Sequence, residues 1–242
     1  MSGTLLSNKI IQIYGYLQQE FNVLEESEFI KSLSNLDGSN FILSTYNFYH
    51  FIESLNMLYG ACLTKTVSNT QTNYMIGILY KNNLIYNKKN MFFEFMKHLS
   101  SHKFYINDSY YLKNSITLPI DNLITELCNT IAKKNCHECI IILFIYEYII
   151  EKVYYKKFNE YYNDQIKLNL LEIPYTLIDP INICDLLKYE LINILKFEDS
   201  LDINIDGDVN NNLINKDFKE LSLYVINLFK KLNDDIVKIW NL

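Results

Sequence analysis

The longest apolar stretch of the chain spans Cys139–Tyr155, and within Ile140–Ile150 the only polar residue is Glu147. A helix that is apolar on all sides must be surrounded by other elements. The apolar run is too short to cross a bilayer, which needs about 20 residues. The unbroken pattern over His137–Tyr162 is also longer than a strand. We therefore predict a buried central helix, with Glu147 as the one polar group that the pattern places in the core.

A second helix is predicted by apolar positions that alternate at four- and three-residue steps and end near Val67. This seam consists of Phe41, Thr45, Phe48, Ile52, Leu55, Tyr59 and Cys62. Such spacing indicates a long helix that packs nearly parallel to its neighbours. Similar patterns predict further helices at Leu5–Phe21, Glu26–Leu33, Thr72–Ile85, Asn87–Ser101, Pro119–Lys134, Ile183–Phe197 and Asp217–Trp240. With no repeat and no linker, residues 1–242 are predicted to form a single all-α domain, a multi-helix bundle around the buried central helix.

Composition and charge narrow the partners that the protein could bind. The chain contains only 6 glycines and 3 prolines, which favours helices over a sheet with many turns. It has no arginine, and its formal net charge is −6. Arginine provides the forked donors that read phosphate and guanine, and an acidic surface repels a polyanion. Nucleic acid is therefore not expected as a partner.

The five cysteines and the N-terminal residues bear on the cellular compartment. An odd number of cysteines without a secretory signal suits a reducing environment, where a buried thiol behaves as a small apolar group. No charged leader precedes an apolar run. We expect an intracellular protein without a membrane span, in the cytoplasm or in an organelle after removal of a targeting peptide that this chain does not contain.

Glu147 is the leading candidate for chemistry. A buried carboxylate must be paired, protonated or bound to a metal, because leaving it charged and alone costs several kcal/mol. Its neighbours one helical turn away carry no positive charge, so any partner must come from another helix. The candidates on the seam helix are Tyr49, Tyr59 and His50. Two interpretations of Glu147 therefore stay open: a carboxylate that pairs with a neighbour for structural reasons, and a carboxylate with a function.

Two short motifs give weaker indications of a metal site than Glu147 gives of a functional group. Cys136-His-Glu-Cys139 is a lone C-x-x-C without the second pair that a zinc site needs, and it is better interpreted as the packed start of a helix. Asp202-Ile-Asn-Ile-Asp-Gly-Asp-Val209 matches the first two-thirds of a calcium-binding EF-hand loop. Its twelfth position is Leu213 instead of a bidentate glutamate, so this segment is better interpreted as a solvated connection.

Two segments near the N-terminus carry a resemblance to a known superfamily. Glu28–Leu33 is followed by a short turn, by Phe41 and by Tyr46–Leu55. This order resembles the opening of the heme-oxygenase-like superfamily, which includes heme oxygenases, thiaminase-type enzymes and iron-containing oxidases. The resemblance implies an all-α, heme-oxygenase-like bundle over most of the chain.

The heme-binding features of that superfamily are missing. The heme-ligating histidine would fall at Phe21, and the glycine-rich distal helix would fall near Ile149–Tyr155, which contains no glycine. Heme is therefore not expected as a cofactor.

The iron-containing oxidases resemble the chain more closely, through Ile78–Met96 and Phe197–Asp202. Two of their ligands would fall at Asn82 and Lys89, which are poor ligands for iron. The resemblance leaves three carboxylate positions for a metal: Glu147, Glu198 and Asp202. Thiaminase-type members use a cysteine nucleophile and a carboxylate, for which Cys62 and Glu147 could be offered.

Two functions follow from this resemblance. The first is a divergent, non-catalytic member, a pseudoenzyme that binds a protein partner or a small-molecule ligand in a cavity at Glu147, His50, Tyr49 and Cys62. It would need no cofactor and is compatible with homo-oligomers. The alternative is a metal-dependent oxidase with iron or manganese. The residues leave open whether the protein is an enzyme.

Overall fold

The regular structure of the described residues is entirely helical. The computed structural model describes residues 15–32, 54, 56–68, 70, 73–74, 76–77, 80, 117–157, 160 and 216–241. Its elements are α2 (Glu28–Ser32), α7 (Thr117–Lys133), α8 (Cys136–Ile149), the π-helix η2 (Ile150–Tyr155) and α11 (Lys216–Trp240). Helical segments also span 15–25 and 56–65. The described part contains no strand, which confirms the all-α class.

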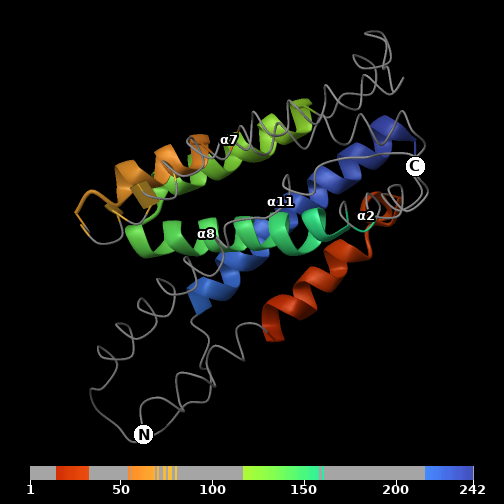
Figure 1. The fold of residues 1–242 in the computed structure, drawn as a ribbon, viewed down its shortest axis with the longest axis horizontal. Helices are drawn as coiled ribbons and strands as arrows, with labels where there is room; N and C mark the ends of the chain where they lie inside the picture. The colour runs from red at the N-terminus through yellow and green to blue at the C-terminus, as the bar shows by residue number, and fades with distance from the viewer. Residues whose placement is uncertain are drawn as a thin grey trace, which may run out of the picture.

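α8 is the central helix, as predicted. Every side chain from Cys139 to Ile149 is buried. Figure 1 shows α8 in the middle of the coloured helices, with α7 along one side and α11 crossing it, and both contact α8. The helix begins with a capping box, in which the Asn135 side chain accepts from the Glu138 N–H and the Glu138 carboxylate accepts from the Asn135 N–H. These bonds satisfy backbone donors that a helix start otherwise leaves open.

Removing the Glu138 side chain by Glu138→Ala is expected to lower the free energy of unfolding at neutral pH by about 1 kcal/mol, the usual value of a helix cap. Burial alone would raise the pKa of Glu138, but hydrogen bonds from Lys134 and the Asn135 N–H outweigh it and hold the pKa below its usual value. A depressed folded-state pKa means that the stabilisation is fully present above the unfolded value of about 4.3 and is lost as the pH falls through the folded-state pKa.

Urea unfolding of both proteins across the acid range checks this prediction. The difference in stability between them should shrink at the acid end. A difference that stays constant from neutral pH to well below the unfolded pKa would contradict it.

The helices around α8 have largely the predicted bounds. α7 carries Pro119 in its first turn, where a missing N–H is harmless. α11 is amphipathic and buries Phe218, Val225 and Phe229 against the core. The segment at 15–25 extends beyond the predicted end at Phe21, and the segment at 56–65 ends close to the predicted end of the seam helix. All described helices share one hydrophobic core.

The segment after α8 differs from the predicted continuous α-helix. At Ile150 the backbone N–H bonds to the carbonyls of both Tyr146 and Glu147, and the chain then continues as η2. A π-turn inserts one extra residue per turn, a feature that often occurs at functional sites. Within η2, Val153 and Tyr154 stay buried.

Glu147 is not the only polar group in the core, so this part of the prediction was wrong. The Tyr154 hydroxyl donates to Asn233 Oδ1 at 2.5 Å, and Asn233 Nδ2 donates to Ser27 Oγ at 3.0 Å. Asn233 is 1% exposed, and Ser54, Thr66 and Ser222 are buried as well. Burying these groups is tolerable where hydrogen bonds replace those lost to water.

Several predicted elements lie outside the described residues. They are the seam before residue 54, the helices at Asn87–Ser101 and Ile183–Phe197, and the loop Asp202–Leu213. The single domain over the whole chain therefore stays a prediction. Among the described residues, no helix combines the length and the apolar character that crossing a membrane requires.

Candidate functional site

The centre of the molecule contains a carboxylate–phenol pair. Glu147 projects from the middle of α8 and is 5% exposed, and Tyr59, from the helical segment at 56–65, is fully buried. The Tyr59 hydroxyl donates a hydrogen bond to Glu147 Oε1. The prediction that Glu147 finds its partner on another helix, with Tyr59 as one candidate, is thus confirmed for this contact. A phenol that donates to a buried carboxylate offsets part of the cost of removing its charge from water.

A second buried phenol lies next to this pair in the sequence. Tyr146 is fully buried, and its hydroxyl has no hydrogen-bond partner among the described residues. Burial and, after it, the negative charge of Glu147 raise the pKa of Tyr146 well above its ordinary value. Tyr146 therefore stays neutral and packs as an aromatic ring, with its ring centroid 5.5 Å from that of Phe229.

Cys62 is buried, and burial raises the pKa of its thiol well above the ordinary value. Cys139 on α8 is buried as well, and its thiol donates a hydrogen bond to the Ile131 carbonyl oxygen at 3.7 Å. Cys139 lies eight positions before Glu147 on the same helix, which is about 12 Å along the axis. The pairing of Cys62 with Glu147 that the thiaminase-type resemblance implies therefore stays a prediction.

The other predicted site residues fall outside the described ranges. They are Tyr49, His50, Glu198 and Asp202. Among the residues that the structure describes, no three histidine, cysteine or carboxylate side chains come close enough together to hold a metal ion. The three-carboxylate metal site and the cavity at Tyr49 and His50 therefore stay predictions.

Sequence reasoning did not find the polar surface groove between α7, the start of α8 and α11. Its volume is about 350 Å³. It is lined by Glu126, Thr130, Lys133, Lys134, Glu138, Glu220, Leu221 and Tyr224. Apart from Leu221 these are charged or hydroxyl-bearing residues on the outer faces of three helices, and such faces give no signal that separates a groove from ordinary solvated surface.

The groove has one hydrogen-bonded wall and one ion-paired end. Tyr224 donates to Glu126 Oε1 at 2.9 Å, and its hydroxyl lies 3.0 Å from Thr130 Oγ1. At the end near α8, Lys134 Nζ lies 2.7 Å from Glu138 Oε1. Burial, followed by the Glu126 carboxylate, raises the pKa of Tyr224 although Thr130 acts against it. The hydroxyl is therefore a neutral donor and acceptor at physiological pH.

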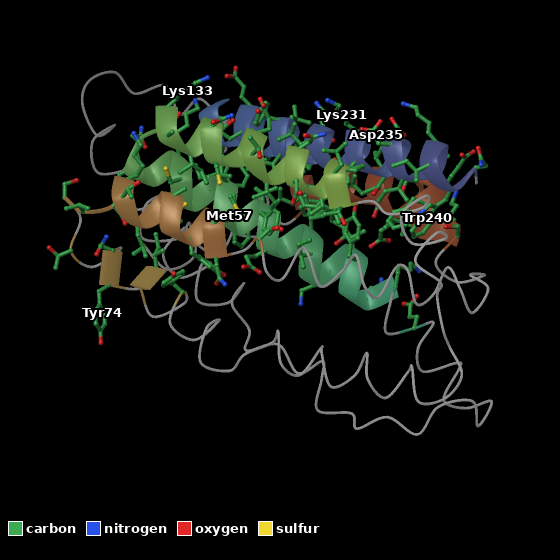
Figure 2. The ribbon with its side chains drawn as sticks, turned by 90° about the horizontal axis from the view of Figure 1, so that it is seen from above. Met57, Tyr74, Lys133, Lys231, Asp235 and Trp240 are labelled. Carbon is green, nitrogen blue, oxygen red and sulfur yellow. The ribbon has the colours of Figure 1, made fainter. Side chains whose placement is uncertain are left out.

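Lys133 extends this groove towards solvent. Its side chain is exposed and points away from the bundle (Figure 2). The groove thus presents ammonium groups from Lys133 at the end of α7 and from Lys134 just after it, near carboxylates from α7, α8 and α11 and beside the apolar Leu221. Opposite charges at close range in one concave surface can hold a ligand that carries both charges.

No protein-family model, no curated protein and no solved structure matches the chain.

Proposed function

We propose that the protein is a non-catalytic helical binding protein, and that the groove between α7, α8 and α11 receives a small zwitterionic ligand. The observation that carries this proposal is the groove itself, about 350 Å³ in volume with lysines and glutamates on its walls. This volume is within the range of small-molecule sites, roughly 300–1,000 Å³. Membership of the heme-oxygenase-like superfamily is part of the proposal, supported by the all-helical architecture around a buried α8.

The charges of the groove favour a molecule with an amine at one end and a carboxylate at the other. Lys134 is already engaged with Glu138, which leaves the exposed Lys133 to meet a ligand carboxylate. Glu126 and Glu220 lie on facing helices and would meet an ammonium group. A diamine would bring a positive charge against Lys133, and a dicarboxylate would bring a negative charge against the glutamates. Both are like-charge contacts that disfavour binding.

Calorimetric titration with a series of α,ω-amino carboxylic acids tests the proposal, with diamines and dicarboxylates of equal length for comparison. The amino acids should bind, and Lys133→Met and Glu126→Gln should each weaken binding about tenfold, which corresponds to about 1.4 kcal/mol. Lys231→Met, an exposed lysine farther along α11 and outside the groove, is the matched control and should leave binding unchanged (Figure 2). Equal binding of diamines, or no binding of any amino acid, would refute the proposal. Iron or manganese retained by the purified protein would favour the oxidase alternative.

Heme is expected not to form a ligated complex with this protein. Phe21 occupies the position at which the resemblance would require a histidine, and its ring is buried and stacked on Tyr148 with centroids 4.7 Å apart. A phenylalanine offers no ligand atom to iron. Titration of the purified protein with heme should therefore give no Soret band of histidine-ligated heme. Such a band at one equivalent of heme would overturn this expectation.

A further inference from the structure

Glu126, Thr130 and Tyr224 form an oxygen triad on the wall of the groove. Glu126 and Thr130 lie about one turn apart on α7, and Tyr224 reaches them from α11. The Tyr224 hydroxyl donates to Glu126 Oε1 at 2.9 Å, and Thr130 Oγ1 donates to the Glu126 carbonyl oxygen at 2.8 Å. The two hydroxyl oxygens also lie 3.0 Å from each other. The triad therefore contains three oxygen–oxygen contacts within hydrogen-bond distance.

The oxygen triad has one hydrogen too few for its contacts. A hydroxyl carries a single hydrogen, and a glutamate carboxylate carries none. Two hydrogens therefore serve three contacts, so one contact always joins two oxygen atoms without a hydrogen between them. If Thr130 donates to the Glu126 carbonyl and Tyr224 to the carboxylate, the contact of 3.0 Å between the two hydroxyls is the one left without a hydrogen. The triad is thus rich in acceptors and short of a donor.

The charges around the triad favour the same kind of ligand group. Among the described residues Glu126 forms no ion pair with a lysine, whereas Glu138 is paired with Lys134. Lys133 points away from the bundle (Figure 2), and Glu220 adds a further carboxylate to the lining of the groove. The triad therefore lacks a positive charge as well as a hydrogen-bond donor. An ammonium group with N–H bonds supplies both.

We propose that the oxygen triad makes the groove selective for a primary ammonium group over a fully methylated one. This inference rests on the proposed function, because it assigns the ammonium end of the zwitterionic ligand to the triad. A primary ammonium has three N–H donors, so it supplies the missing hydrogen to the hydroxyl oxygens and also donates to the Glu126 carboxylate. A trimethylammonium group carries the same charge but no donor. Thr130 and Tyr224 are therefore specificity-determining residues.

Calorimetric titration of the full-length protein compares each α,ω-amino carboxylic acid with its N-trimethylated betaine of equal length. The betaine should bind about tenfold more weakly, because it leaves the triad without a donor. This ratio of affinities should fall by about threefold in Tyr224→Phe and in Thr130→Val, since each removes a hydroxyl oxygen that the ammonium group contacts. Tyr74→Phe is the matched control and should keep the ratio, because Tyr74 is 71% exposed and points away from the bundle (Figure 2).

The outcomes distinguish this inference from the proposed function. Equal affinities for the amino acids and their betaines would overturn the inference and leave the proposed function standing. A ratio that stays unchanged in both Tyr224→Phe and Thr130→Val would also overturn it, because valine has the shape of threonine and the bulk of the methyl groups would then explain the preference. No binding of any amino acid would refute the proposed function and this inference with it. Both residues are half-buried, so the variants should keep the helical signal in circular dichroism.

Discussion

Substituting Ile142 or Phe144 by aspartate is expected to unfold the protein. Both side chains lie on α8 and are 0% exposed. An aspartate at either position would be buried without a partner, which costs at least several kcal/mol and also leaves a cavity where the apolar side chain stood. A typical domain has only about 5–15 kcal/mol of stability to lose. Circular dichroism should show a loss of helical signal and of the cooperative thermal transition.

Leu118→Asp is the matched control for these substitutions. Leu118 is an apolar residue in a neighbouring helix, α7, but it is 69% exposed. The same change of side chain there should alter the free energy of unfolding by no more than about 0.5 kcal/mol. If Ile142→Asp had the same helical signal and the same melting temperature as Leu118→Asp, α8 could not be the buried centre of the fold.

Replacing Tyr59 by phenylalanine is expected to lower the free energy of unfolding by about 2–4 kcal/mol, because it removes the hydroxyl that donates to the buried Glu147 carboxylate. Glu147→Gln should cost less, since an amide oxygen can still accept from the Tyr59 hydroxyl. Urea unfolding measures both values. If Glu147 is structural, neither substitution should change binding in the groove between α7, α8 and α11, nor any metal content.

A double substitution tests how much the interaction between Tyr59 and Glu147 itself contributes to the free energy of unfolding. Replacing both partners by apolar residues, as in Tyr59→Phe with Glu147→Leu, removes the buried charge together with its donor. The double variant should therefore be more stable than Tyr59→Phe alone. If the double variant lost as much free energy of unfolding as the two single variants together, the hydrogen bond would not couple the two residues. A loss of ligand or metal binding in Glu147→Gln, with the fold retained, would instead assign Glu147 to a functional site.

The sequence was sufficient to predict the elements whose faces are strongly apolar. The limits of α7 and α11 follow from the spacing of their apolar residues and from Pro119, and the position of α8 follows from its apolar surface on all sides. The partner of Glu147 could be narrowed to a few residues because its own helix offers none. In these cases a single energetic term, the burial of apolar area, decides the structure.

The features that the sequence did not reveal depend on contacts between distant segments. Asn233 lies among apolar neighbours on α11, and its burial becomes understandable only once Tyr154 and Ser27 are seen to bind it. The groove brings Glu126 on α7 close to Tyr224 on α11. Each residue alone resembles ordinary helix surface, so only the three-dimensional arrangement shows that they share a site.

The π-helix η2 also has a consequence for the phase of the long helix that contains α8. Each residue of an α-helix turns the chain by about 100°, so one extra residue shifts the direction of every later side chain by about that angle. The α-helical spacing of α8 therefore does not predict the side-chain directions beyond Tyr155. The side chains of residues 156–157 and 160 are rotated by about 100° from the directions that this spacing would give. In geometric terms, η2 has the effect of one extra residue within the helix. The residues before and after η2 can thus face different neighbours without a break in the helix between Cys136 and Lys157.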